Sequence, residues 1–506
     1  MDNALYDIPD SWKWVTLDDI GIVVSGGTPS TKEPEYWNGD VPWITPADLS
    51  NYDNVYISKG ARNITSLGLE YSSANLLPKD SIVFSSRAPI GYVAITKNEL
   101  ATNQGFKNLI IWKDLINPKY VYYFLHTIKD VAENLASGTT FLELSASKFK
   151  QLPFPLTIID EQNQIVNKVE ELFSVLDNSL SQLNESLSKS LFLKQKILDN
   201  IIIKNNSAYI ELNALTESID YGFASKSYKL EKTNSIHYLR ITDIQNGEIN
   251  WANVPYCNIE DKQIVEKYSL KENDILFARS GNTVGKSILL SNVPNSIYAS
   301  YLIRIRCKNA LLDAKFLAFF MQTSYYWKQI NEGVSGIGQP NFNGTKLANM
   351  LVPYLDIESQ QEAVDYVESN FIGIDKLISE IRNSITRIKI LKSQILKYAY
   401  TGKLINETAD YNIDLVLKMI QEKKNKYHKE LIAINKTRKK PQKAKVNLHD
   451  VISKNFKKEV FSYSELYKHV KFSKSVLKMM FEELEMTNKV ISYFDEKSGT
   501  IKYKLV

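Results

Sequence analysis

Two long stretches of the chain carry apolar residues at alternating steps of three and four, which keeps one side of a helix apolar. In the second stretch the series is Val364, Val367, Phe371, Ile374, Ile378, Ile381, Ile385, Ile388 and Ile395. In the first stretch it is Val166, Val169, Phe173, Leu176, Leu180, Leu183, Leu187, Ser190 and Ile197. Sustained over about four heptads, this spacing is typical of helices that pack as a coiled coil. The pattern predicts two long helices that contact each other.

The two stretches belong to one unit that occurs twice. Two pairs of segments align at the same offset of 198 residues: PLTIIDEQNQIV (155–166) with PYLDIESQQEAV (353–364), and FLKQKIL (192–198) with ILKSQIL (390–396). Lys194 and Lys392 fall at the same position of the apolar series. An ordinary amphipathic core helix explains one such stretch, but it does not explain the shared frame, length and lysine. The duplication is therefore a property of the whole architecture.

A segment of a different kind precedes each helix, with short strand-like runs between Gly, Asn, Pro and Ser turns. Each segment ends in a helical pattern, over 118–135 in the first copy and 314–330 in the second. The segments align more loosely than the helices do: KDSIVFSSRAPIG (79–91) with ENDILFARSGNTVG (272–285), and SGTTFLELS (137–145) with SGIGQPNFN (335–343). The sequence predicts two globular α+β domains that share a framework and present different faces.

The remaining hundred residues lie outside the repeat and are basic. From residue 406 onward there are 22 Lys and Arg against 13 Asp and Glu, a net charge of +9, so the rest of the +5 chain carries −4. A helix over 411–434 and a basic linker over 435–445 precede two helices and a β-hairpin that turns at residues 497–499. That order resembles a small winged-helix domain. It could grip DNA through Lys471, Lys474 and Lys478 or dock a protein, and the glutamates that follow favour docking.

The predicted organisation has six parts. They are a first globular domain (1–155), a first helix (156–203), a second globular domain (204–353), a second helix (354–405), a helix with a basic linker (406–445) and a winged-helix-like domain (446–506).

Composition narrows the class of protein. The chain is 44% hydrophobic and 24% charged, as in folded globular proteins. Cys257 and Cys307 make no metal-ligand spacing, and the five histidines are scattered, so neither zinc nor disulfides are expected. The start MDNALYDIPD lacks the features of a signal peptide, and no apolar run is long enough for a membrane helix. A reducing cytoplasm is the expected location.

Two segments look like catalytic motifs but are better explained otherwise. NPKY (117–120) lacks the second proline of an adenine methyltransferase motif and opens a helical pattern. GNTVGKS (281–287) has one residue too few between its glycines for a phosphate loop, and its counterpart in the first copy has no such character. We interpret the first as a helix start and the second as a turn, and we expect no catalytic residues and no metal site.

The first 405 residues resemble the specificity subunit of type I restriction-modification systems. The resemblance rests on the order domain–helix–domain–helix together with SSRAPIGYVAI (85–95), NQGF (103–106), ARSGNTVGKS (278–287), the Pro-initiated helices and the ending YAYTGKL (398–404). It implies that each globular domain recognises three to five base pairs of a split DNA site, and that the helices form an antiparallel spacer. It also implies docking of two modification subunits, which bring S-adenosylmethionine and methylate adenine N6. Motor-endonuclease subunits with ATP and Mg would join them for restriction, in phage defence.

The loops that correspond across the repeat are the expected DNA contacts. Arginine can grip phosphate or read guanine, and amide side chains can read adenine. The candidates are Ser25, Thr28, Arg87, Asn103, Gln104, Thr139 and Thr140 in the first domain, and Arg279, Asn282, Gln339 and Asn341 in the second. An internal ion pair for the arginines, and capping or turn roles for the amides, are the alternatives.

Two other functions are compatible with parts of the sequence. A coiled-coil scaffold whose globular domains bind proteins would show no salt-sensitive binding to duplex DNA. An ATP-using enzyme built on 281–287 would bind nucleotide as an isolated chain. We expect neither, because two diverged domains of equal size suit a split DNA site best.

Overall fold

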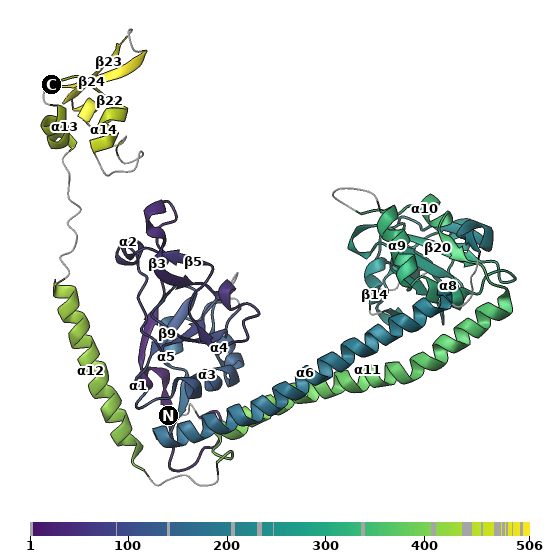
Figure 1. Ribbon diagram of the computed structural model, residues 1–506, viewed down its shortest axis with the longest axis horizontal. Coiled ribbons are helices and arrows are strands. Elements are labelled where there is room, and N and C mark those ends of the chain that lie inside the picture. Colours follow the sequence, from purple (N-terminus) through teal and green to yellow (C-terminus); the bar gives the residue numbers. More distant parts are fainter. Residues whose placement is uncertain are drawn as a thin grey trace. The chain divides into compact units, whose positions relative to one another are not determined.

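The structure is a computed structural model (Figure 1). It describes residues 4–87, 89–138, 142–203, 208–229, 235–245, 247–334, 340–405, 411–437, 448–456, 459–469, 477, 481, 484–487, 489–495 and 499–506. The chain forms two compact units, one of residues 1–163 and 407–506 and the other of residues 164–406.

The first globular domain is built on a five-stranded sheet in the order β2-β9-β6-β7-β4. Its strands are β2 (Ile22–Ser25), β9 (Phe106–Ile110), β6 (Ile82–Ser85), β7 (Val93–Thr96) and β4 (Tyr56–Ile57). A three-stranded sheet adds β5 (Arg62–Ile64), β3 (Trp37–Ile44) and β8 (Ala101–Thr102), and β1 (Lys13–Thr16) pairs with β10 (Pro153–Leu156). The helices are α1 (Leu17–Ile20), α2 (Ser66–Glu70), α3 (Pro118–Thr127), α4 (Lys129–Leu135) and α5 (Ala146–Lys150). Strands β6, β7 and β9 are buried along their whole length, so the sheet forms the core.

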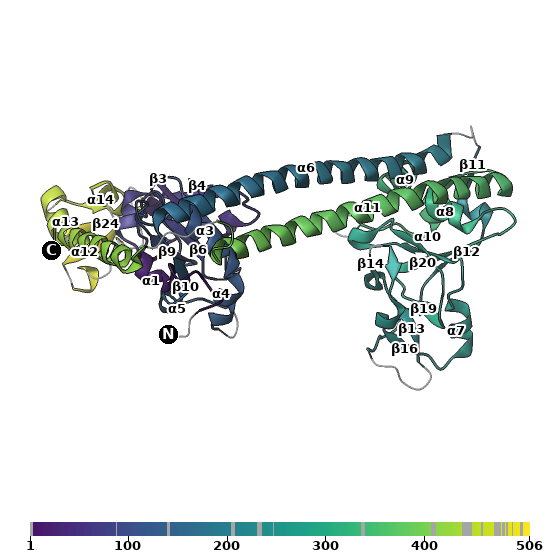
Figure 2. The ribbon, with the colours of Figure 1, turned by 90° about the horizontal axis from the view of Figure 1, so that it is seen from below.

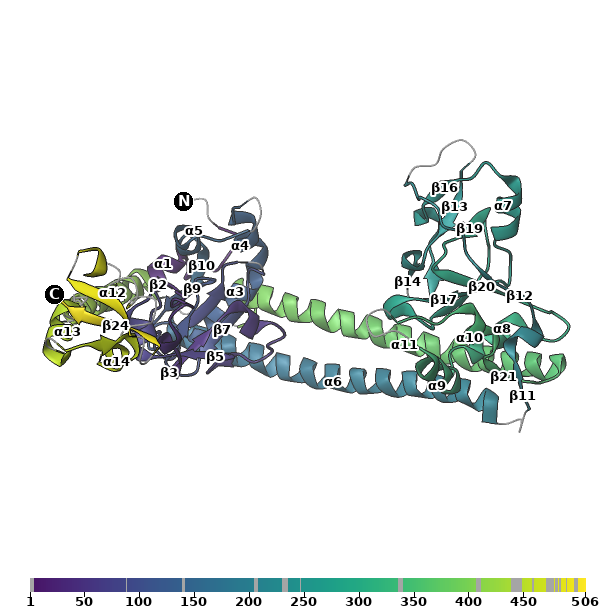
Figure 3. The same cartoon turned by 90° about the horizontal axis from the view of Figure 1, so that it is seen from above.

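The second globular domain repeats this plan with a four-stranded sheet in the order β12-β20-β17-β18. Its strands are β12 (Thr216–Tyr221), β20 (Leu302–Cys307), β17 (Ile275–Ala278) and β18 (Ser287–Leu289). A three-stranded sheet contains β16 (Tyr256–Asn258), β13 (Ser235–Leu239) and β19 (Ser296–Tyr298), and two-stranded sheets join β11 (Tyr209–Glu211) to β21 (Leu351–Pro353) and β14 (Ile244–Gln245) to β15 (Glu248–Ile249). The helices are α7 (Lys262–Tyr268), α8 (Ala314–Phe320), α9 (Ser324–Gly333) and α10 (Gly344–Ala348). Within this unit, the four-stranded sheet lies nearer the long helices than the three-stranded sheet does (Figures 2 and 3).

The duplication extends to single side chains. Asp80 and Asn273 precede the equivalent strands β6 and β17, and both have a φ of 68°. The Gln162 side chain accepts from the backbone N–H of Asn117 at 2.8 Å and donates to the carbonyls of Leu115 and Thr157. In the second copy, Gln360 accepts from Asp313 at 2.8 Å and donates to Leu311 and Leu355. One buried glutamine thus ties each long helix to the start of a helix in the domain before it.

The two helical patterns that end the domains differ from the prediction. Residues 118–135 form α3 and α4, and residues 314–330 form α8 and most of α9, so the expectation of one helix in each place is wrong. Both breaks occur at a threonine: the hydroxyl of Thr127 donates to the carbonyl of Phe124, and that of Thr323 to the carbonyl of Phe320, both at 2.7 Å. Thr323 then caps α9. A hydroxyl that bonds the backbone locally competes with helix continuation.

The predicted coiled coil is confirmed. Helices α6 (Ile159–Ile203) and α11 (Ile357–Tyr400) lie side by side (Figure 1), and every residue of the two apolar series is buried or half-buried. Lys194 forms a 2.6 Å ion pair with Asp375 and lies 4.2 Å from the centre of the Phe371 ring. Lys392 pairs with Asp177 at 2.5 Å and lies over Phe173 at 4.8 Å. The C-terminal part of α6, at residue 194, meets residue 375 of α11, whereas residue 177 of α6 meets residue 392, nearer the end of α11. The helices are therefore antiparallel.

The tail begins with α12 (Ile413–Thr437), which docks on the first domain of its own unit. Ile413, Val416 and Ile420 are buried. Lys423 forms a 2.6 Å ion pair with Asp114. The Nζ of Lys424 donates to the carbonyl of Asp18, the second residue of α1. The sequence predicted the helix but not this contact.

The end of the chain forms a small separate core. It contains α13 (Leu448–Phe456), α14 (Tyr463–His469) and a three-stranded sheet in the order β22-β24-β23. The strands are β22 (Phe461–Ser462), β24 (Thr500–Leu505) and β23 (Val490–Asp495), and β23 and β24 form the predicted hairpin. Lys471, Lys474 and Lys478 lie outside the described residues.

Candidate DNA interface

The topology of the first domain brings its predicted contact residues to one edge of the main sheet. Strands β2 and β6 both run antiparallel to β9, so the ends of β2 and β6 meet the start of β9. Five candidates follow or precede these strand ends, and we call them the first edge: Ser25, Thr28, Arg87, Asn103 and Gln104.

Two loops of the first edge are packed against each other. The hydroxyl of Thr28 donates to the side-chain oxygen of Gln104. Gly26 leaves no room for a side chain, since a Cβ there would lie 1.9 Å from the carbonyl oxygen of Asn103. The Asn103 side chain accepts from the N–H of Gly105 at 2.9 Å, which is the turn role weighed as an alternative. Ser25 and Gln104 are exposed and can meet a ligand without rearrangement of the backbone.

A second cluster at the first edge is cationic but internally paired. The Nε of Arg87 lies 3.0 Å from Glu143, and the Nζ of Lys107 lies 3.5 Å from the other oxygen of the same carboxylate. Burial lowers the pKa of Lys107, while Glu143 acts in the opposite direction. The Arg87 side chain remains 45% exposed, so the ion pair does not remove it from solvent. Arg87 therefore has an internal partner and an open face.

The second domain forms an equivalent edge. The ends of β12 and β17 meet the start of β20. The Arg279 guanidinium lies 4.9 Å from the centre of the Tyr221 ring, and its buried Nε has no hydrogen-bond partner among the residues that the structure describes. Tyr301 is 59% exposed, and Asn282 and Asn341 are exposed as well. We call these residues, with Arg279 and Tyr221, the second edge.

Arg87 and Arg279 are neighbours in the shared framework, not equivalents. Leu144 donates its N–H to the carbonyl of Ser86, whereas Phe342 donates to the carbonyl of Arg279. Ser86 is therefore the counterpart of Arg279, and Arg87 corresponds to Ser280. The two domains place an arginine in the same loop but one residue apart. Thr139, Thr140 and Gln339 lie outside the described residues.

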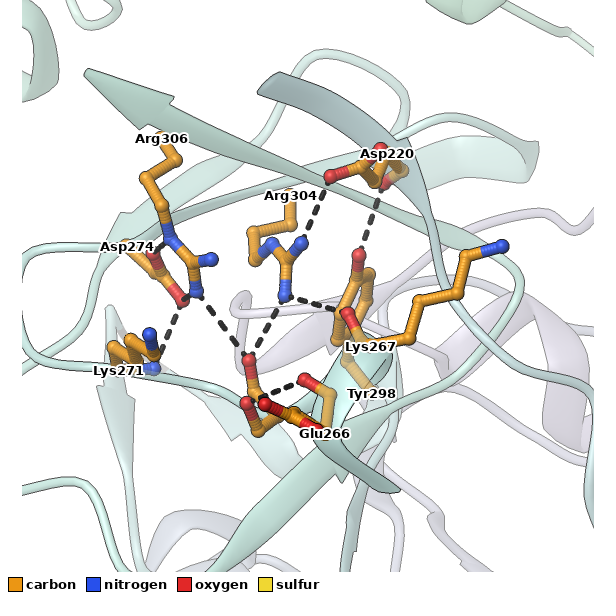
Figure 4. Close-up of polar contacts among 9 residues, drawn as sticks. Asp220, Glu266, Lys267, Lys271, Asp274, Tyr298, Arg304 and Arg306 are labelled. Atoms are coloured by element: carbon orange, nitrogen blue, oxygen red, sulfur yellow. Dashed lines mark hydrogen bonds and ion pairs between the residues drawn. The ribbon is translucent and has the colours of Figure 1, made fainter. Parts of the chain in front are cut away.

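Other arginines of the second domain are structural. Arg304 is 4% exposed and pairs with Asp220 at 2.8 Å, and Arg306 holds Asp274 through two nitrogens (Figure 4). Both also donate to the carbonyl of Ser269 just after α7. This network joins the end of α7 to the main sheet, so neither guanidinium faces a ligand.

A polar cavity of about 860 Å³ in the second domain was not predicted from the sequence. Arg240, Thr242, Asn250, Trp251 and Asn253 are among its lining residues. The signal was present as a further repeat at an offset of 195, between WITPADL (43–49) and YLRITDI (238–244). It is weak because the two segments share one identical residue, Asp, and otherwise only an aromatic and two aliphatic positions.

Two negative findings concern the described ranges only. Within them, no group of three or more His, Cys, Asp or Glu side chains is arranged to hold a metal ion. No helix among the same residues has the length and apolar character needed to cross a membrane.

The two segments that look like catalytic motifs have the structures predicted for them. NPKY starts α3 with Asn117 as the N-cap, and residues 281–283 form a short 3-10 turn.

Comparison with known proteins agrees with this architecture. The family model described as type I restriction modification DNA specificity domain matches the chain twice, over residues 9–189 and 200–387. The chain is 32% identical to the type I restriction enzyme MjaIX specificity subunit of Methanocaldococcus jannaschii, over 79% of this chain and 93% of that protein. It is 21% identical to the EcoBI specificity subunit of Escherichia coli, over 82% and 90% of the two chains.

A solved structure supports the fold independently. A chain from a study of assembly and conformational transition of a type I restriction-modification system superposes with a TM-score of 0.64 at 16% identity. It covers 79% of this chain and 100% of its own length. The second match of the family model ends at residue 387, so α12 and the small C-terminal domain lie beyond it.

Proposed function

The chain belongs to the family of type I restriction-modification DNA specificity subunits, and from this premise we propose that it reads a bipartite DNA site, one half with each globular domain. One observation carries the proposal: two domains share a framework down to single side chains but present different side chains at equivalent edges. A shared framework with different contact residues suits the recognition of two different half-sites. The component that recognises DNA in this family does not itself carry out methylation or cleavage.

We assign the DNA contacts to the two edges. In the first domain, Ser25, Thr28, Asn103 and Gln104 offer hydroxyl and amide groups for base edges or phosphates. Arg87 offers its exposed face, and we add Thr139 and Thr140 from the sequence. In the second domain, Arg279 lies over the Tyr221 ring, and its guanidinium can donate to a phosphate or to a guanine. Asn282, Asn341 and, from the sequence, Gln339 complete this set.

We further propose that two modification subunits dock on the long helices and supply S-adenosylmethionine. The helices expose equivalent apolar pairs: Phe192 and Leu193 are 64% and 52% exposed, and Ile390 and Leu391 are 53% and 44% exposed. Both pairs are related by the repeat offset of 198 residues. Two copies of one exposed apolar patch suit two copies of one partner. Motor-endonuclease subunits, with ATP and Mg, would join that complex.

The test is a genome-wide map of N6-methyladenine with and without this gene, with its neighbouring genes left in place. We expect one bipartite motif with a fixed gap to lose its methylation. If no motif changes while the modification subunit is expressed and active, the chain does not direct methylation. The coiled-coil scaffold would then be the better explanation, and absence of salt-sensitive duplex binding would support it.

For the tail we propose a docking role, with α12 as the attachment to the first domain. The tail could otherwise add a grip on DNA. Truncation at about residue 410 separates these: loss of complex assembly supports docking, and loss of DNA affinity with assembly intact supports a DNA contact. If assembly, affinity and restriction all survive, neither role holds.

A further inference from the structure

We propose that the polar cavity around Arg240 is a base-reading site of the second domain, and that Arg240 recognises a guanine of the second half-site. The inference rests on the proposed function and adds a site outside the two edges.

Arg240 is oriented by a carboxylate before any ligand arrives. Its Nε and Nη2 donate to the two oxygens of Asp243 at 3.0 and 2.8 Å, and its backbone N–H donates to the same carboxylate at 2.9 Å. The remaining end of the guanidinium carries the Nη1 donors and the second Nη2 donor, with one long 3.4 Å contact to Ser227. Two adjacent donors at that end match the O6 and N7 acceptors of guanine. The Arg240 side chain is 40% exposed, so a base edge can reach it.

The cavity lining includes the exposed carboxylate of Glu248, but most of its side chains around this guanidinium are suited to bases. Thr242, Asn250 and Asn253 are exposed polar residues of its lining. Trp251 is half-buried and lines the same space, where it offers an aromatic wall. Hydroxyl and amide groups can both donate and accept, so they can complement the remaining positions of neighbouring base pairs.

The first domain carries the same local structure with a different side chain. The carboxylate of Asp48 accepts from the backbone N–H of Thr45 at 2.7 Å and from its hydroxyl at 2.9 Å. Thr45 is therefore the counterpart of Arg240, and Asp48 the counterpart of Asp243. Both domains keep the aspartate that accepts from the backbone N–H three residues earlier, but the side chain at that earlier position differs. That is the expected difference between two domains that read different sequences.

The position is connected to the segment that leads to the second edge. The N–H of Ala299, two residues before Tyr301, donates to the carbonyl of Leu239, the residue before Arg240, at 2.9 Å. In the first domain the N–H of Asn103 donates to the carbonyl of Ile44, before Thr45, also at 2.9 Å. Arg240 thus corresponds to the place where the first domain sets Thr45 beside Asn103 of the first edge.

The experiment uses Arg240→Thr in the full chain, expressed with its partner subunits. Threonine is what the first domain holds in this frame, so the substitution retains the local capping bonds. We expect one guanine of the second half of the methylated motif to become degenerate, with the first half unchanged. Binding to the native site should weaken roughly 5- to 150-fold and lose its dependence on that base pair.

Two further variants separate the effect of the planar guanidinium of Arg240 from the effect of its positive charge. Arg240→Lys keeps the charge but cannot hold Asp243 and a base with one planar fork, so it should weaken the guanine preference without removing it. Lys262→Thr removes an exposed charge on α7 and should leave the motif unchanged. An unchanged second half-site in both Arg240 variants overturns the inference. If Arg240→Thr fails to fold, Arg240→Lys decides. If the unaltered chain directs no motif, the proposed function has failed, and that result is distinct from an intact motif in the variants.

Discussion

At the scale of single residues, Glu143 holds the positive charge that the first edge would offer to DNA. One carboxylate pairs with both Arg87 and Lys107, and Lys107 is nearly buried. If the first edge contacts DNA as we propose, phosphates compete with this carboxylate for the exposed face of Arg87. The internal pair and the proposed DNA contact are then two states of one arginine, and the balance between them can be measured.

We predict that Glu143→Gln strengthens DNA binding by the assembled complex at low salt and makes it more dependent on salt. Glutamine keeps the size of the side chain but releases Arg87 to a phosphate. One additional phosphate contact changes the slope of log K against log salt by about −0.9. Titration of duplex binding at several salt concentrations measures it, with Glu70→Gln, an exposed carboxylate on α2, as the control. An unchanged slope would mean that Arg87 pairs only within its own domain and gains no phosphate contact.

The two cysteines give a second prediction at this scale. Burial raises the pKa of Cys257 to about 11 and that of Cys307 to about 12. Since the thiolate is the reactive form, at pH 8 only about one Cys257 in a thousand is ionised. We expect neither cysteine of the folded chain to react with a thiol reagent within minutes at pH 8, and both to react after denaturation in urea. Rapid modification of the native chain would contradict the burial of these side chains.

At the scale of elements, the repeat determined what the sequence could predict. The two long helices and the presence of short strands in the segment before each of them were predicted correctly, because apolar periodicity and a duplicated frame supported each other. The helices over 118–135 and 314–330 were predicted as continuous because apolar spacing does not register a threonine that bonds its own backbone. Arg240 was missed because its role depends on Asp243 and on a strand pairing with β19. The docking of α12 was missed because its partner, α1, is about 400 residues away in the chain.

The contact of α12 with the first domain gives an element-scale prediction. Ile420 is fully buried, whereas Met419, the preceding residue, is 40% exposed. We expect Ile420→Ala to weaken docking of the helix by about 2–5 kcal/mol and Met419→Ala to have little effect. Limited proteolysis should then cleave α12 in the first variant and leave it protected in the second. Equal protection would mean that the Ile420 side chain is not needed to hold α12 on the first domain.

At the scale of the whole molecule, the spacer is the antiparallel pair of α6 and α11. Two lysine–aspartate ion pairs between these helices define their register. Lys194 with Asp375 and Lys392 with Asp177 are related by the repeat, and each lysine also lies over an aromatic ring. A shift of one helix along the other by a turn would separate both pairs together. Half-exposed ion pairs contribute little to stability, so their value here lies in selecting one register.

The register makes the length of the spacer testable. Deleting residues 180–186 from α6 together with the facing residues 383–389 from α11 retains both lysine–aspartate pairs. Seven residues are close to two helical turns, so the faces stay aligned while each helix shortens by about 10 Å. At ~3.4 Å per base pair, we expect the unread gap of the methylated motif to shorten by about three base pairs, with both half-sites unchanged. Deletion of 180–186 alone is the control, because it breaks the register and should abolish the motif. An unchanged gap after the paired deletion would show that the helices do not set the spacing, since nothing else in the paired variant alters the domains that read the half-sites.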